Sequence, residues 1–392
     1  MVFTLPSPQN FLEIRLQNCL EKSLQFLAAQ GQRGFAEAAH RMVFPQTQGF
    51  ISSQEEHQGD IFARALIADT LCDLRAHFGE VWQPLIEREI NYLLSCQRQT
   101  GVGGWGYFPY LPELPPDADD LAQIMQILVR SQRWDEAKKA CELPLAVLLN
   151  DNYYPDGSFE TWIIPKHNPT PEQQLQGEWA RLAWGMGPDP DVMANLLYAL
   201  ALYDGERFSQ VIEKGLTYLE NQQKADGSWQ SSWYHGPFYG TYVCLRLLAL
   251  VRPLSPSIEQ GMSFLGASQR EDGGWGVEEI SEPLSTALAL LGLAMFQSQE
   301  TNSVTRNGVR LPSPATFGGE KRNFLHGDCV LKGLSYLQEY YQQSEQSWPS
   351  CRFIRMELGR ASGQVRAILF YGSRTITTAF VVKAILAWQQ FD

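Results

Sequence analysis

Positive charge is scarce in this sequence, and the shortage excludes one class of partner. The 392 residues include 31 Lys and Arg against 43 Asp and Glu, which gives a net charge of −12. Nucleic-acid binding requires clustered Lys and Arg, because these side chains neutralise the phosphates. We therefore expect no nucleic-acid partner.

The sequence also lacks long apolar runs and paired cysteines. The longest uncharged apolar run, residues 283–296, is shorter than the ~20 residues that a membrane-spanning helix needs. Residues 1–16 have no basic start followed by an apolar stretch, so they do not resemble a signal peptide. The seven cysteines are dispersed and form no C-x-x-C pair, which is typical of reduced thiols. We expect a soluble, cytoplasmic protein.

Aromatic and apolar residues, by contrast, are abundant. Hydrophobic residues make up 44% of the chain and charged residues 19%, which excludes a disordered protein. The clearest pattern is a repeat in which a Gln precedes a Trp across a Gly-containing or polar turn. We interpret each copy as an amphipathic helix that ends near the Gln, followed by a turn that the Trp covers. Trp229, Trp275 and Trp348 are assigned to structure. The copies are Gln223/Trp229, Gln269/Trp275, Gln342/Trp348 and the looser Gln97/Trp105.

Each turn is followed by a second segment that is apolar nearly all round, which is typical of a helix buried on both sides. Alternating amphipathic and apolar helices in about six pairs predict an all-α fold, a single (α/α)6 barrel forming one domain over residues 1–392. An open helical solenoid is the alternative. Residues 152–188 and 299–326 interrupt the pattern as long irregular stretches. The apolar segments are 59–71, 119–129, 191–203, 239–251, 284–296 and 377–389.

Three acids, Asp117, Asp119 and Asp120, follow two prolines at the start of one apolar segment. The simplest interpretation is helix capping, because free backbone N–H groups and the helix dipole stabilise a carboxylate. A chemical interpretation also fits. Three carboxyls within one turn do not all ionise easily, so one keeps its proton, while the helix N-terminus stabilises the carboxylate that remains after proton transfer. Such a group is a strong general acid.

The D-x-D-D motif together with the Gln…Gly-x-Trp repeats resembles the class II terpene cyclases, the squalene–hopene cyclase group. The resemblance covers most of the chain. It implies an α-barrel enzyme that needs no cofactor and that cyclises polyprenyl chains by protonating a terminal double bond or epoxide. By position, Asp119 would be the proton donor, with Asp117 and Asp120 as its hydrogen-bonded neighbours.

Two departures from the family pattern follow from the same comparison. The squalene–hopene type has a histidine partner for the acid in a stretch resembling D-V-x-A-H, whereas this chain has Asn195 at that position. Asn can donate a hydrogen bond but carries no charge. The chain also has room for only one helical domain, so it is similar to the single-domain type exemplified by merosterolic acid synthase. That similarity implies a hydrophobic, prenylated substrate, a geranylgeranylated hydroxybenzoate.

Aromatic side chains near the expected cavity mouth would stabilise carbocations through their ring faces, although ordinary core packing is the alternative for each of them. The terminating base is left open among His57, His235, Tyr239 and water. A substrate carboxylate would need a cation, for which Lys166, Arg322 and Arg374 are candidates. The expected wall residues are Phe108, Trp162, Trp184, Phe238, Tyr239 and Tyr242.

Other functions remain as alternatives. A class II cyclase of a prenyl diphosphate would use Mg²⁺. A zinc prenyltransferase-like subunit is suggested by residues 326–329 (HGDC), but no His follows to complete a zinc site, so we expect no metal. A carbohydrate enzyme would need carboxylates opposed across a cleft, and a non-enzymatic helical scaffold would need none. An oily substrate favours peripheral membrane contact, and the oligomeric state is left open.

Overall fold

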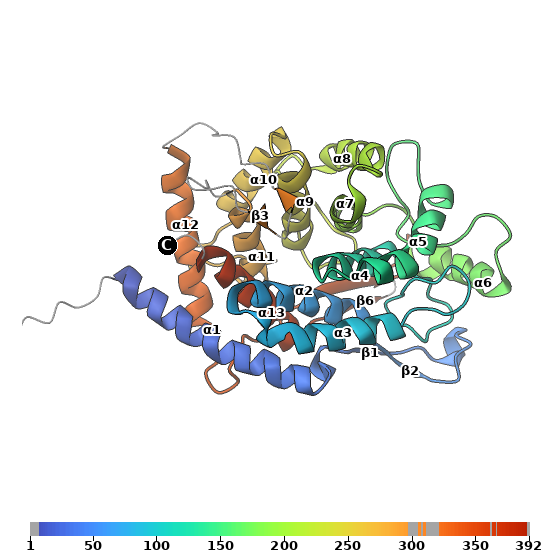
Figure 1. Cartoon of the computed structure of the whole chain (residues 1–392), viewed down its shortest axis with the longest axis horizontal. Helices are drawn as coiled ribbons and strands as arrows, with labels where there is room; N and C mark the ends of the chain where they lie inside the picture. The colour runs from blue at the N-terminus through green and yellow to red at the C-terminus, as the bar shows by residue number, and fades with distance from the viewer. Residues whose placement is uncertain are drawn as a thin grey trace, which may run out of the picture.

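The computed structural model describes residues 8–296, 305–306, 309–310, 321–360, 363–365 and 367–389. Six of its helices pack in a closed ring, each against the next in chain order, with the last returning to the first (Figure 1). They coincide with the six predicted apolar segments, and the predicted helical fold class is confirmed. The ring helices are α2 (Ile61–Phe78), α4 (Ala118–Arg130), α7 (Pro190–Asp204), α9 (Phe238–Val251), α11 (Pro283–Ala294) and α13 (Arg374–Gln389).

The remaining long helices lie against the outside of this ring. Helix α3 packs on α2 and α4, α5 on α4, α8 on α7, α10 on α9 and α11, and α12 on α11. The first helix, α1, packs on α12 and on the last helix, α13 (Figure 1). In the described part of the chain, no helix has the length and apolarity needed to cross a bilayer. The outer helices are α1 (Pro8–Gln32), α3 (Gln83–Ser95), α5 (Trp134–Asp151), α8 (Ser209–Gln222), α10 (Pro256–Ala267) and α12 (Lys321–Glu339).

The Gln and Trp of each repeat join an outer helix to its neighbours. Trp275 is fully buried, and its indole Nε1 donates to the carbonyl of Leu265 near the end of α10 at 2.7 Å. Its backbone N–H donates to Thr286 Oγ1 on the ring helix α11 at 2.9 Å. Gln269 Nε2 donates to the carbonyl of Cys329 on the next outer helix at 2.7 Å. Each repeat thus satisfies carbonyls that a helix C-terminus leaves free, and Trp229 and Trp348 make the same two kinds of bond.

The sequence predicted no strands, but the described residues include three short antiparallel hairpins. Segments this short give too little alternation to be recognised against a helical background. The stretch 152–188 also contains a helix, α6 (Pro171–Trp179), followed by a π-helical turn over Ala180–Trp184. Most of 299–326 lies outside the described residues. The hairpins are β1 (His40–Val43) with β2 (Glu56–Gly59), β3 (Thr305–Arg306) with β4 (Val309–Arg310), and β5 (Ile354–Leu358) with β6 (Ala367–Tyr371).

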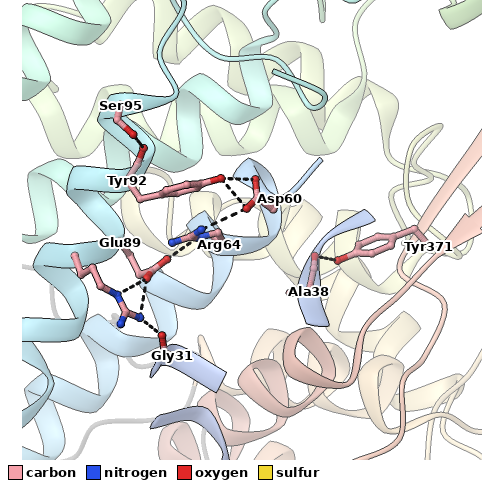
Figure 2. Close-up of polar contacts among 9 residues, drawn as sticks. Gly31, Ala38, Asp60, Arg64, Glu89, Tyr92, Ser95 and Tyr371 are labelled. Carbon is pink, nitrogen blue, oxygen red and sulfur yellow. Dashed lines mark hydrogen bonds and ion pairs between the residues drawn. The ribbon is translucent and has the colours of Figure 1, made fainter. Parts of the chain in front are cut away.

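A buried ionic cluster ties the beginning of α2 to α3, as Figure 2 shows. Arg64 Nε donates to Glu89 Oε2 at 2.6 Å, and the Arg64 guanidinium also pairs with Asp60 at 3.3 Å. The hydroxyl of Tyr92 donates to Asp60 at 2.8 Å. Glu89 is fully buried and also pairs with Arg88 at 3.2 Å, so removing Arg64 would leave this buried carboxylate with one of its two cations. The cluster therefore fixes the N-terminal end of α2, which contributes to the end of the ring where the acids lie.

Candidate active site

The three acids of the D-x-D-D motif have three different environments at the N-terminus of α4. Asp117 is the N-cap, and its Oδ1 accepts from the backbone N–H groups of Asp119 (3.1 Å) and Asp120 (2.8 Å). The Asp117 N–H in turn donates to the carbonyl of Trp105, and the next N–H donates to the carbonyl of Thr161. Capping therefore accounts for Asp117 alone, and the other two carboxyls are left for another purpose.

Asp119 is buried and accepts two side-chain hydrogen bonds. Asn195 Nδ2 donates to its Oδ1 at 2.8 Å, and the hydroxyl of Tyr234 donates to its Oδ2 at 2.5 Å. Burial raises the pKa of Asp119 to about 6, against the opposing effect of these two bonds. The carboxyl is therefore half-protonated near pH 6 and about a tenth protonated at pH 7, and donors are already in place for its carboxylate form.

The carboxyl group of Asp120 receives no comparable hydrogen bonds within the described part of the chain. It is almost completely buried, and neither of its carboxyl oxygens accepts a hydrogen bond from an N–H or O–H group of the described residues. Burial and the neighbouring Asp117 raise the pKa of Asp120 well above its usual value. Burial also raises the pKa of Asp117 to about 7. The protonated form of the Asp120 carboxyl is therefore favoured over its carboxylate.

Asn195 is held by a cation on the adjacent ring helix. Arg246 Nη2 donates to Asn195 Oδ1 at 2.9 Å, which fixes the amide orientation so that Nδ2 faces Asp119. The guanidinium also lies over the ring of Tyr198, 4.2 Å from its centroid. The positive charge of Arg246 lowers the pKa of Asp119. A cation thus acts on the acid through one intervening amide.

An apolar cavity opens directly at these acids, and the space between its atoms and the adjoining solvent amounts to about 600 Å³. The indole N–H groups of Trp162 and Trp184 donate to the carbonyls of Gly185 (2.6 Å) and Glu113 (3.4 Å). Their polar atoms are thereby satisfied by the protein, so these indoles offer the cavity apolar ring surface. Besides the three acids, the lining residues are Phe62, Tyr107, Phe108, Leu114, Thr161, Trp162, Trp184, Val192, Trp233, Tyr234, Ile354 and Met356.

A profile of the squalene-hopene cyclase C-terminal domain family matches residues 97–353. The chain belongs to this family. The matched span includes the D-x-D-D motif, Asn195, Arg246 and Tyr234. A curated squalene-hopene cyclase from Schizosaccharomyces japonicus is 29% identical over 177 residues, which are 42% of this chain. The match spans only about a quarter (26%) of that relative's length.

Solved structures share the fold at low sequence identity. The type II terpene cyclase MstE from Scytonema is 18% identical, with a TM-score of 0.66 over 96% of this chain and 99% of that one. An ent-copalyl diphosphate synthase from Streptomyces platensis is 17% identical, with a TM-score of 0.54 over 83% of this chain and 50% of that one. A possible GH105 member from Salmonella enterica also matches, at 11% identity and a TM-score of 0.56 over 96% of this chain and 93% of that one. These likenesses show the fold.

In this member of the squalene–hopene cyclase family, three of the six expected wall residues line the cavity: Phe108, Trp162 and Trp184. Among the described residues, the other three do not line it. Phe238 packs on Phe264 of α10 at 5.9 Å between centroids, and the Tyr242 ring lies 5.6 Å from the Arg246 guanidinium. Tyr239 sits behind the acid, where its hydroxyl accepts from Asn195 Nδ2 at 3.1 Å.

The histidines and cations suggested by the sequence lie away from the cavity lining. His57 bonds to Ser52 and Gln54, and His235 packs edge-on against Phe370. Lys166 is exposed. Arg374 donates to Gln342 and Ser347. The side chain of Arg322 lies outside the described residues. Within the described ranges, no group of three or more His, Cys, Asp or Glu is arranged to hold a metal ion.

Two important residues were not singled out from the sequence. Tyr234 lies in the aromatic-rich stretch 232–242, but nothing in its spacing separates it from its neighbours. Its position depends on β5, because Tyr234 bridges to Ile354 and the adjoining Arg355 N–H donates to the Trp233 carbonyl. Arg246 carried a clearer signal, since it is the only charged residue in the apolar segment 239–251, and buried Arg is rare without a partner.

Proposed function

We propose that this protein is a class II terpene cyclase, which protonates the terminal double bond of a linear polyprenyl chain and closes the chain into fused rings. The observation that carries the proposal is Asp119, a buried acid with a raised pKa at a helix N-terminus, facing an aromatic, apolar cavity. Family membership supports it. So does MstE, whose solved complexes contain geranylgeranyl dihydroxybenzoate as substrate and merosterolic acid A as product.

The geometry accounts for each stage of such a reaction. Asp119 transfers its proton to the alkene, and its carboxylate is stabilised by Tyr234, by Asn195 and by the N-terminus of α4. Asp120, whose protonated form is favoured, adds no negative charge against that ionisation, whereas the charge of Asp189 opposes it. The tertiary cation then meets indole and phenyl faces, each worth ~0.5–2 kcal/mol of cation–π stabilisation. The apolar lining excludes water that would capture the cation early.

The proposed substrate is a geranylgeranylated hydroxybenzoate, and one cation near the cavity suits its head group. The Arg360 guanidinium lies 4.4 Å from the ring centroid of Trp233, which lines the cavity. It donates to the carbonyls of Ser232 (3.1 Å) and Trp184 (3.4 Å), and makes no salt bridge with the described residues. Burial lowers the pKa of Arg360, so an incoming carboxylate would be a favourable partner.

Within this proposal, residues 1–392 act as one catalytic unit in the cytoplasm. Asp119 supplies the proton and the aromatic side chains of the cavity stabilise the carbocation, so these steps require no cofactor. A diphosphate substrate would bring Mg²⁺ with it. The substrate's long prenyl chain favours brief contact with a membrane that supplies it.

The test is a substrate panel of a geranylgeranylated hydroxybenzoate, the matching arene without its carboxyl group, and geranylgeranyl diphosphate. We expect the carboxylated arene to be cyclised with the highest kcat/KM. In Arg360→Met, we expect the KM for the carboxylated arene to rise about tenfold, because one charge-assisted hydrogen bond is lost. The KM for the neutral arene should change little. Arg207→Met is the matched control, because Arg207 pairs with Glu142 on the outer surface. Preferred turnover of the diphosphate with EDTA sensitivity would instead identify a diphosphate cyclase.

A further inference from the structure

A second proton-transfer group lies in the wall of the same cavity, close to the acids but separate from them. We propose that Tyr107, with His40 behind it, is the base that removes the last proton and ends the cyclisation. This inference rests on the proposed cyclase function. It assigns a catalytic role to a lining tyrosine, and a proton-accepting role to a histidine that does not line the cavity.

Tyr107 connects the cavity to His40 directly. It lines the cavity, and its hydroxyl lies 3.0 Å from His40 Nδ1. His40 begins β1, where it pairs with Gly59 of β2. A Cβ at Gly59 would lie 2.5 Å from the Tyr107 carbonyl oxygen. Only glycine therefore fits at position 59, against the backbone of Tyr107. The β1–β2 hairpin thereby brings the rings of His40 and Tyr107 together.

The imidazole of His40 is held in place by aromatic contacts. Tyr371 of β6 stacks on it with ring centroids 4.6 Å apart, and Phe108 packs at 5.4 Å. The hydroxyl of Tyr371 donates to the carbonyl of Ala38, two residues before His40, as Figure 2 shows. Two hairpins from opposite ends of the chain thus fix the orientation of a histidine that is only 8% exposed.

The other polar groups of the lining have different tasks. Tyr234 and the three acids form the proton-donating site. Thr161 Oγ1 donates to the carbonyl of Gly187 at 2.9 Å. The indole N–H groups of the lining tryptophans are donors only. Outside the proton-donating site, Tyr107 is therefore the described lining residue whose hydroxyl has a proton acceptor behind it.

The step balances as a two-proton relay. The C–H bond next to the final carbocation breaks, and its electron pair becomes the C=C π bond that removes the positive charge. The proton goes to the Tyr107 oxygen while the original phenolic proton moves to His40 Nδ1. The products are an alkene, a neutral Tyr107 and a His40 imidazolium, which returns its proton to solvent.

Both groups are in the protonation state that this relay needs. Burial lowers the pKa of His40 to about 4, so its imidazole is neutral at pH 7 and can accept a proton. Burial, with smaller effects from Tyr371, Asp120 and Asp117, raises the pKa of Tyr107 well above its usual value. The resting phenol is therefore neutral. A standing phenolate would be alkylated by the cation, whereas a neutral phenol backed by imidazole takes only a proton.

The test compares the products of Tyr107→Phe and His40→Asn with those of the wild type, using the substrate that the panel identifies. Because deprotonation follows the initiating protonation, we expect substrate consumption to stay within about threefold. The ratio of the native alkene to isomeric alkenes and water-trapped alcohols should fall by about tenfold or more. Asn keeps a hydrogen bond to Tyr107 but cannot take up a proton. His57→Asn is the control, since His57 is also buried, in the paired strand β2, but bonds to Ser52.

The outcomes separate this inference from the proposed function. Native product ratios in both variants, with turnover retained, would overturn the base assignment and leave the cyclase intact. An absence of cyclised product from the wild type would overturn the proposed function itself. If Tyr107→Phe fails to fold by circular dichroism, His40→Asn decides the question alone. A shift shared by His57→Asn would mark the effect as general disturbance and would also overturn the assignment.

Discussion

We expect Asp119→Asn to abolish cyclisation, with a fall in kcat of at least about 10³-fold, equivalent to about 4 kcal/mol. The reason is that an amide cannot transfer a proton to an alkene, although it fills the same space and can still hydrogen-bond to Tyr234 and Asn195. Substrate binding should persist, because the cavity wall is unchanged. The measurement is product formation by mass spectrometry, together with binding of the unreacted substrate.

The same substitution should not destabilise the fold. The folded-state pKa of Asp119 is raised from 3.8 to about 6. Its ionisation therefore opposes folding, and the stability it costs grows as pH rises from about 4 to 6 and stays lost above that. At pH 7.5, Asp119→Asn removes this cost, so its unfolding temperature should equal or exceed that of the wild type. An inactive variant with a lower unfolding temperature would point to structural damage instead.

We expect Arg246→Met to lower kcat by about 10- to 50-fold, roughly 1.4–2.3 kcal/mol, because the carboxylate left on Asp119 loses a cation acting through Asn195. Removing that charge also raises the pKa of Asp119. Activity depends on the protonated acid and falls as pH rises through the pKa of Asp119, so the alkaline limb of the pH–rate profile shifts to higher pH. The other groups that set this pKa, Tyr234 and Asp189, stay unchanged.

A rescue variant distinguishes this electrostatic role from packing. In Arg246→Met/Asn195→His, an imidazole beside Asp119 carries its own positive charge, as in the D-V-x-A-H pattern that the sequence resembles. We expect part of the lost rate to return. Arg252→Met is the control, since Arg252 follows the same helix but pairs with Glu213 and Glu220. An unshifted pH profile in Arg246→Met, or equal losses in Arg252→Met, would contradict the role of Arg246.

The ring helices were predictable from the sequence because a helix buried on all sides has an almost entirely apolar composition. A segment such as 284–296 is apolar on every face, which only a helix enclosed on all sides tolerates. The repeated Gln and Trp marked where outer helices end. The hairpins were not predictable, because β5 and β6 are five residues each and gain their register from contacts with Tyr234 and Trp233 rather than from their own alternation.

The acid motif was predictable, but its surroundings were only partly so. The roles of Asp117 and Asp119 were assigned from the D-x-D-D motif of the family that the sequence resembles. Asn195 was assigned from its place in the stretch that resembles D-V-x-A-H. Tyr234 was missed together with the hairpin that positions it, since both depend on contacts across 115 residues or more. Phe238 and Tyr242 were placed on the wall because they are aromatic and near the start of α9. The start of α9 has several faces, however: Phe238 packs against α10, and Tyr242 packs against Arg246.

The most direct test of proton-initiated cyclisation is turnover of the preferred substrate by the wild-type enzyme in D₂O. Asp119 exchanges its proton with solvent, so it should deliver deuterium to the terminal alkene, and a proton already bound to carbon should be lost at the end. The product should therefore be cyclic and about one mass unit heavier than the substrate, with deuterium at the carbon that was protonated. A cyclic product without deuterium would contradict the account.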